Sequence, residues 1–398
     1  MTYDFTSVLD RKGKDAVAVD APPLLAPIRD GFDLIPMWVA DMNFPVCPAV
    51  TDAIRARLDH PTFGYFDPRP EYFDAILRWQ RDRHGVEGLE PQHIGYENGV
   101  LGGVASALAA LCAPGEPVLL HSPAYVGFAH TLADNGYRAV HSPLVRDDQG
   151  VWRMDFGDME EKIAQNNIHT AILCSPHNPS GRVWERWELE KAMELFEKYD
   201  VYVISDEIWS DIVRPGVRHI PTQSVSDDAK QRAVALYAPT KTFNLAGFVG
   251  SYHIIYNKRL RDRVVHQSER SHYNEMNLLS MYALMGAYSD QGAEWAGQLN
   301  AVLAANADYA CDFIAAHFDG VETAKPQGTY MLFLDCTRWC NHHGKTLEEL
   351  LAAGHSVGVA WQDGRPFYGP SHIRVNLALP LSRVQEAFQR LDRYVFDP

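Results

Sequence analysis

The segment Leu236-Tyr-Ala-Pro-Thr-Lys-Thr-Phe-Asn-Leu-Ala-Gly247 places a lysine, Lys241, in a turn after an apolar run. Upstream, Val201-Tyr-Val-Ile-Ser-Asp-Glu-Ile-Trp209 is a β-branched run that leads into the acids Asp206 and Glu207. Earlier still, Ile172-Leu-Cys-Ser-Pro-His-Asn-Pro-Ser-Gly181 is an apolar run that breaks into a turn. Because open α/β sheets bind ligands at the carboxyl ends of their strands, these runs predict that an amine, a carboxylate and an amide meet there.

This set of groups suits pyridoxal 5′-phosphate (PLP), which needs a lysine that binds it covalently and an acid for its pyridinium nitrogen. Lys241 and Asp206 are the candidates, and Asn178 can donate to the ring hydroxylate. Taken singly, each has a plainer interpretation: a solvated lysine, a helix-capping acid and a turn residue. Their order along the chain favours the cofactor site.

Three motifs resemble the fold-type I PLP-dependent enzymes of the class I/II aminotransferase family. They are Ser175-Pro-His-Asn-Pro-Ser-Gly181, Ser205-Asp-Glu-Ile208 and Thr240-Lys-Thr-Phe-Asn-Leu-Ala-Gly247. More narrowly, the chain is similar to the MalY/PatB-type C–S β-lyases, which include cystathionine β-lyase. The similarity runs from Phe5 to the C-terminal helix.

The resemblance implies an α/β fold with a mostly parallel central sheet, helices on both faces, and a smaller α+β domain. The expected division is an N-terminal segment, 1–45, that packs with the small domain, a large PLP-binding domain, 46–290, and a small C-terminal domain, 291–398. Alternating strand-like and helix-like runs along the chain point to the same class.

Composition restricts the partners of the chain. With 398 residues it can bury a large core, and its net charge of −15 argues against a nucleic-acid ligand. The start shows no signal-peptide pattern, and the longest apolar run, 100–113, is too short to span a membrane. Six cysteines without regular spacing indicate reduced thiols and a cytoplasmic enzyme.

A metal site is not expected, although four potential ligands lie close together in sequence. Their spacing is not that of a zinc knuckle. These residues are Cys336, Cys340, His342 and His343.

Gly99, Val100 and Leu101 open an Ala-rich helix. The unpaired N–H groups of a first helical turn form an anion site, so these residues are candidates for the PLP phosphate. The run is not Gly-x-Gly-x-x-Gly, which argues against a nicotinamide dinucleotide. Many aminotransferases hold the phosphate with an arginine a few residues after the lysine, but Val249 lies in that neighbourhood here. Thr240 is a further candidate for holding the phosphate.

Two tyrosines are candidate cofactor contacts by resemblance. Tyr125 matches the family's aromatic residue that stacks on the pyridine ring, and with Lys241 and Asp206 it completes the expected catalytic set. Tyr65 matches a tyrosine that reaches the PLP phosphate of a second copy of the chain, which implies a homodimer with shared active sites. The alternative for each is a core aromatic residue.

Arg374 is the candidate for binding the α-carboxylate of an amino-acid substrate, because a guanidinium binds a carboxylate through two parallel hydrogen bonds. It alternates with apolar Ile373 and Val375, which disfavours a plain surface role. The resemblance also brings Val39 and Asn178 to the substrate. For Val39, a packed linker is the alternative.

The activity implied is a PLP-dependent carbon–sulfur lyase reaction. It is α,β-elimination on cystathionine, cysteine or related S-substituted L-cysteines, giving pyruvate, ammonia and a thiol. An aminotransferase acting on a small or hydrophobic amino acid is the alternative. Trp209 departs from the lyase pattern, which usually has histidine after Asp-Glu-Ile. The chain lacks the glycine fingerprint that a nicotinamide dehydrogenase needs. In a PLP-binding protein without turnover, Lys241 and Asp206 would have no catalytic role. Both alternatives are therefore disfavoured.

Overall fold

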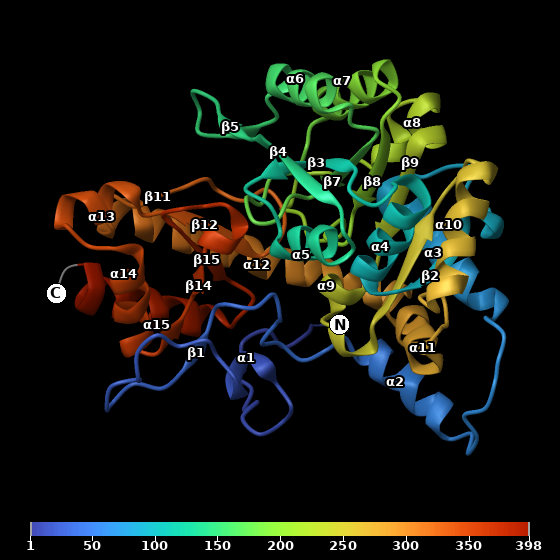
Figure 1. The fold of residues 1–398 in the computed structure, drawn as a ribbon. Helices are drawn as coiled ribbons and strands as arrows, with labels where there is room; N and C mark the ends of the chain where they lie inside the picture. Colours follow the sequence, from blue (N-terminus) through green and yellow to red (C-terminus); the bar gives the residue numbers. More distant parts are fainter. Residues whose placement is uncertain (1, 397–398) are drawn as a thin grey trace. The chain divides into compact units, whose positions relative to one another are not determined.

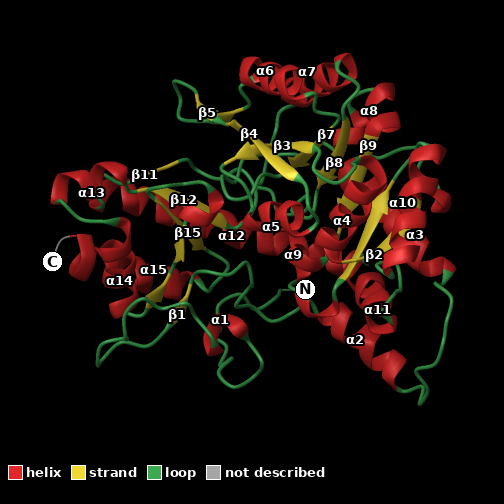
Figure 2. Cartoon of the chain, viewed as in Figure 1, coloured by secondary structure: helices red, strands yellow, loops and turns green. Residues whose placement is uncertain are grey.

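The computed structural model describes residues 2–396. The chain separates into two compact units. Unit 1 comprises Met1–Pro45, Pro179–Gly181 and Gln298–Pro398, and unit 2 comprises Val46–Asn178 and Arg182–Gly297. Figure 1 shows the chain from end to end, and Figure 2 shows its helices and strands.

Unit 2 is built on a seven-stranded sheet, counted over residues 2–396, with the order β2-β10-β9-β8-β7-β3-β4. Strands β4, β3, β7, β8 and β9 run parallel, whereas β10 is antiparallel to both of its neighbours. The mostly parallel central sheet is therefore confirmed. The strands are β2 (Ile94–Asn98), β3 (Pro117–Ser122), β4 (Arg138–Pro143), β7 (Thr170–Cys174), β8 (Tyr202–Asp206), β9 (Ala233–Tyr237) and β10 (Gly250–Ile254).

Helices cover both faces of this sheet (Figure 1). Side chains of a strand alternate between its faces. On β3, Val118 and Leu120 enter a core with α4, α5 and α10, whereas Leu119 enters a second core with α6, α7 and α8. The helices of unit 2 are α2 (Pro48–Leu58), α3 (Pro70–His84), α4 (Gly99–Leu111), α5 (Val126–Asp134), α6 (Phe156–Asn166), α7 (Arg186–Lys198), α8 (Asp227–Arg232), α9 (Thr240–Phe243), α10 (Lys258–Ser271) and α11 (Leu278–Ala287). Its short elements are η1 (Pro91–His93), β5 (Val145–Arg146), β6 (Trp152–Arg153), η2 (Thr222–Ser224) and η3 (Ala246–Phe248).

Unit 1 has its own apolar core around a four-stranded antiparallel sheet in the order β11-β12-β15-β14, as far as residues 2–396 show. Helix α12 (Asp290–His317) begins in unit 2 and ends in unit 1. The other elements are α1 (Val17–Asp20), β1 (Ile35–Pro36), β11 (Glu322–Thr323), β12 (Met331–Asp335), α13 (Thr337–His343), α14 (Leu347–Ser356), β13 (Val359–Ala360), β14 (Gln362–Asp363), η4 (Arg365–Phe367), β15 (His372–Asn376), α15 (Leu381–Leu391) and η5 (Asp392–Phe396).

Local sequence signals explain several boundaries. Helices α2 and α3 begin at a proline, whose missing N–H costs nothing in the first turn. Helix α3 ends at Gly85, which adopts the left-handed conformation with φ of 67°. Strand β10 begins only at Gly250, because Val249 takes a φ of 56° in the turn that precedes it.

Helices α2 and α11 pack closely at Gly286, where an added Cβ lies 2.4 Å from the carbonyl oxygen of Ala49. We expect Gly286→Ala to lower the stability of the protein by about 1–3 kcal/mol, because the backbone of α2 must move. Thermal denaturation measures the effect. The control is Gly297→Ala in α12, where an added Cβ meets nothing within 4 Å and the alanine favours the helix. Equal melting temperatures for the two variants contradict the expectation.

Candidate active site

Asp206 ends strand β8 as a buried carboxyl group, with 4% of its surface exposed. Among residues 2–396, the amide of Ile208 donates to its carboxylate, at 3.0 Å. Burial raises the pKa of Asp206 to about 7, although the Ile208 hydrogen bond and Lys241 act in the opposite direction and Glu207 adds to the rise. A carboxyl in this state is stabilised as an anion by a cationic partner.

Lys241 lies on α9, just beyond the end of β9, and is close enough to Asp206 to lower its pKa. Its amino nitrogen is 5.7 Å from the centre of the Trp209 ring. Trp209 itself is buried, with 2% exposed. Trp209, the residue that departs from the lyase pattern, therefore lies against Lys241. The sequence did not predict this contact.

Asn178 follows the end of β7, the neighbour of β8 in the sheet. Cys174 pairs with Asp206 in the register of the two strands, and the amide of Ser175 donates to the Asp206 carbonyl at 2.9 Å. The thiol of Cys174 lies near both groups: burial and Asp206 raise its pKa, whereas a hydrogen bond from the backbone of Asn178 lowers it. The structure thus brings Asn178 to the same sheet edge as Asp206 and Lys241.

The first turn of α4 presents its backbone N–H groups without a side-chain cap from Asn98. Gly99 has a φ of 73°, and a Cβ added there lies 3.6 Å from Val249. At Gly127, a Cβ meets the ring of Tyr125 at 2.4 Å and Leu101 at 3.0 Å. The side chain of Leu101 and the ring of Tyr125 therefore lie close together, and the aliphatic side chain of Val249 lies beside Gly99.

Glu207, the neighbour of Asp206, is fully buried. The sequence did not predict that its carboxylate binds the surrounding loop. Burial opposes its ionisation, but His219, Tyr237 and the amide of Thr222 lower its pKa. Adjacent strand residues point to opposite faces, which could have indicated that Glu207 does not share the pocket of Asp206. Its carboxylate contacts Ser205 Oγ at 2.9 Å, Thr222 N at 3.0 Å, His219 Nε2 at 2.7 Å and the Tyr237 hydroxyl at 2.6 Å.

In unit 1, Arg374 lies on β15 and is 3% exposed. Its guanidinium donates to the Trp38 carbonyl at 3.2 Å and to Gln362, and lies 4.3 Å from the centre of the Phe367 ring. On the same strand, the Asn376 amide donates to the Val39 carbonyl at 2.7 Å. The segment of Trp38 and Val39, far from Arg374 in sequence, therefore lies against strand β15 in this unit.

Tyr65 lies in the loop between α2 and α3 and is fully exposed. It borders a surface hollow of about 590 Å³ with Phe63 and Met276. Phe63 is also 58% exposed, with Arg57 stacked on it at 5.1 Å. The alternative of a core aromatic is therefore wrong for Tyr65.

The residues of unit 2 fit PLP. The buried Asp206 carboxyl suits a pyridinium nitrogen, the α4 amides suit a phosphate, and Lys241 supplies the amine. Together with the sheet topology, this arrangement defines the fold-type I class of PLP-dependent enzymes.

The chain belongs to the aminotransferase class I and II family, which residues 33–391 match. It is 34% identical to cystathionine β-lyase PatB of Bacillus subtilis over 90% of this chain and 92% of PatB. It is 31% identical to protein MalY of Escherichia coli over 96% of each chain. The PLP-containing structure of cystalysin from Treponema denticola superposes with a TM-score of 0.90, at 29% identity and 100% coverage of both chains.

Residues 2–396 include no helix that is both long and apolar enough to cross a membrane.

The raised pKa of Asp206 predicts that ionisation of this carboxyl group lowers the stability of the folded, cofactor-free protein, by an amount that depends on pH. Its folded value of about 7 exceeds the usual 3.8, so the penalty is absent below pH 4 and grows as the pH rises to about 7. We expect Asp206→Asn to gain stability over the unsubstituted protein by up to about 4 kcal/mol as the pH rises through this window. Urea denaturation at pH 5 and pH 8 measures it. Asp67→Asn, at an exposed position, is the control, and a pH-independent difference for Asp206→Asn refutes the prediction.

Proposed function

We propose that this chain is a PLP-dependent C–S β-lyase. It carries out α,β-elimination on cystathionine, cysteine or related S-substituted L-cysteines and releases pyruvate, ammonia and a thiol. The observation that carries the proposal is the buried Asp206 carboxyl beside Lys241, in a chain whose similar relatives include a cystathionine β-lyase. The assignment of individual residues below is part of the proposal.

The cofactor is held by groups from several strand ends. Lys241 binds it covalently, and the Asp206 carboxylate pairs with its ring nitrogen. Asn178 would donate to the ring oxygen, and the ring of Tyr125 would stack on the cofactor. Gly99, Val100, Leu101 and Thr240 hold the phosphate.

When bound, PLP withdraws electrons from the substrate Cα and so makes its proton acidic. Lys241 would take that proton as the general base, because its place in the cofactor site would keep its amino group within reach of Cα. The Cβ–S bond then breaks, the sulfur leaves as a thiol or thiolate, and one water molecule hydrolyses the remaining three-carbon fragment to pyruvate and ammonia. The carboxylate of Asp206 stabilises the positive charge on the ring nitrogen throughout, because burial strengthens their attraction.

Arg374 orients the substrate through its α-carboxylate. Its guanidinium is already fixed by Trp38 and Gln362, so less side-chain freedom is lost on binding. Val39, whose carbonyl accepts a hydrogen bond from Asn376 of the same strand as Arg374, contacts the substrate, as does Asn178.

The proposed enzyme is a cytoplasmic homodimer with shared active sites. Exposure of Tyr65 and Phe63 on one loop supports a second copy as their partner, because large exposed aromatics mark interaction sites. In such a dimer Tyr65 reaches the cofactor phosphate of the partner and adds a donor that Val249 cannot supply. All six cysteines are free thiols, in keeping with a reducing compartment.

The reaction is tested by incubating the purified enzyme with cystathionine, cysteine and an amino acid–keto acid pair while pyruvate, thiol and pyridoxamine phosphate are measured together. We expect pyruvate and thiol to dominate. Lys241→Ala is expected to lower turnover by about 10²–10⁴-fold or more, because the general base is lost. Lys258→Ala, at a lysine that is 78% exposed, is the control. Pyridoxamine phosphate without pyruvate identifies an aminotransferase instead.

Shared sites are tested by mixing Tyr65→Ala chains with Lys241→Ala chains. Each variant alone is expected to be nearly inactive, whereas an equal mixture regains about a quarter of the unsubstituted activity, since half of the dimers hold one complete site. Tagged chains verify subunit exchange, and a chain with both substitutions mixed with Lys241→Ala is the inactive control. No recovery after verified exchange means that each chain forms its site alone.

A further inference from the structure

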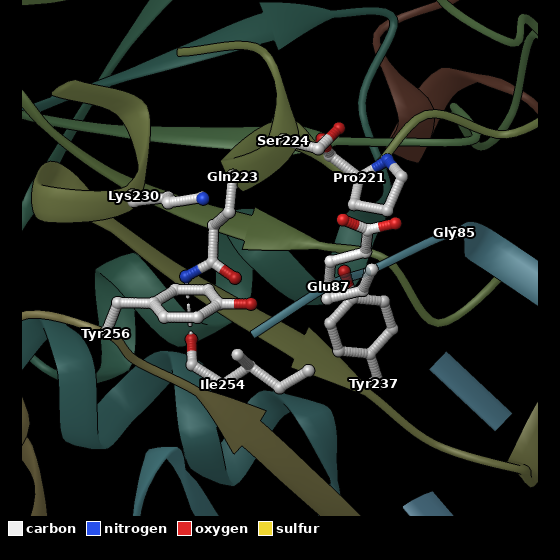
Figure 3. Close-up of a pocket in the computed structure, with 10 residues that line it drawn as sticks. Gly85, Glu87, Pro221, Gln223, Ser224, Lys230, Tyr237, Ile254 and Tyr256 are labelled. Atoms are coloured by element: carbon white, nitrogen blue, oxygen red, sulfur yellow. Dashed lines mark hydrogen bonds between the residues drawn. The ribbon is translucent and has the colours of Figure 1, made fainter. Parts of the chain in front are cut away.

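A second pocket, separate from the candidate active site, opens on unit 2 and has a volume of about 190 Å³ (Figure 3). None of the residues assigned to the cofactor lines it. The volume is several times the roughly 30 Å³ of one water molecule and less than the roughly 300 Å³ at which drug-sized ligand sites begin. Its lining comes from the loop after α3, η2, α8, β9, and β10 with the residues that follow it.

Two opposite charges border this pocket. Lys230 on α8 and Glu87 in the loop after α3 form no ion pair with any residue in 2–396. The ammonium of Lys230 lies 5.8 Å from the centre of the Tyr256 ring, and Glu87 is exposed. A lysine and a glutamate that do not neutralise each other at one pocket favour a ligand that carries both signs of charge.

The polar groups between these charges are held in place. Gln223, 3% exposed, donates its amide hydrogens to the carbonyls of Ala233 at 2.9 Å and Ile254 at 2.8 Å. The carbonyl oxygen of that amide remains as an acceptor, and Figure 3 shows it on the other side of the amide from the hydrogen bond to Ile254. Burial raises the pKa of Tyr256 to about 12, so its hydroxyl stays a donor.

Apolar surface completes the pocket. Pro221, Val86 and the side chain of Ile254 contribute aliphatic wall, and the half-buried ring of Tyr256 contributes an aromatic one. This combination of opposite charges, fixed hydrogen-bonding groups and a small apolar surface matches an amino acid with a short aliphatic side chain.

We propose that this pocket binds a small zwitterion of the amino-acid class. Lys230 binds its carboxylate, Glu87 and the Gln223 oxygen bind its ammonium, and its side chain packs on Tyr256. The site does not depend on the lyase reaction, since it uses none of the catalytic groups. Tyr237 also lines this pocket. Its hydroxyl donates to the carboxylate of Glu207, the residue next to Asp206, at 2.6 Å.

The test is trace acetylation of lysines in the PLP-loaded enzyme, followed by mass spectrometry of the peptide that contains Lys230. L-Valine is the probe, because it has no sulfur to eliminate. At ten times its dissociation constant, it is expected to slow labelling of Lys230 roughly tenfold by mass action. Exposed Lys14, in unit 1, is the internal reference and should label at an unchanged rate.

Single-charge analogues separate a zwitterion site from a simple ion site. 3-Methylbutanoate lacks the ammonium and isobutylamine lacks the carboxylate, so neither should protect Lys230 comparably. Equal protection by 3-methylbutanoate, or none by L-valine, overturns the proposal.

Glu87→Gln separates binding in this pocket from an indirect effect of L-valine at the active site. The substitution is expected to abolish protection of Lys230 without changing its labelling in the absence of L-valine. Glu269→Gln, also at an exposed position, is the matched control and should keep the protection. Protection that survives Glu87→Gln refutes the assignment. Because no outcome depends on turnover, failure here leaves the lyase assay unaffected.

Discussion

The structure of unit 2 depends on one constraint, the burial of the Asp206 carboxyl group away from water at the end of strand β8. Asp206 is nearly inaccessible, and its environment holds its pKa near 7. The neighbouring acid, Glu207, points the other way and is stabilised by its own hydrogen bonds, so one strand end buries two acids in different states. That difference leaves Asp206 available to a cationic ring, whereas Glu207 holds the loop behind it in place.

In the proposed site, the phosphate is held by helix dipoles more than by a formal positive charge. The first turn of α4 offers backbone N–H groups, and Val249 lies beside Gly99 where many aminotransferases carry an arginine. A helix N-terminus binds anions through unpaired donors and the helix dipole. The exposed Tyr65 is therefore more important for binding the phosphate in the proposed dimer, where it reaches the site of a second copy of the chain.

Much of the fold could be predicted because the relevant signals are local. Continuous apolar or β-branched runs identified β7 and β8, and the structure buries both strands along almost their whole length. The class and family followed from motifs at strand ends. By contrast, the hydrogen bonds of Glu207 come from residues up to thirty positions away in the sequence, and no spacing rule predicts them. The position of the Trp209 ring relative to Lys241 likewise depends on how two strand ends meet.

Trp209 has a further consequence, because its indole is a chromophore. The ring is buried and lies 5.7 Å from the Lys241 nitrogen, and its place in the core fixes its distance from whatever that nitrogen carries. Because indole emission overlaps the absorption of pyridoxal compounds, a cofactor bound to Lys241 is expected to quench the fluorescence of Trp209 by resonance energy transfer. The fluorescence of Trp209 therefore reports whether Lys241 carries the cofactor.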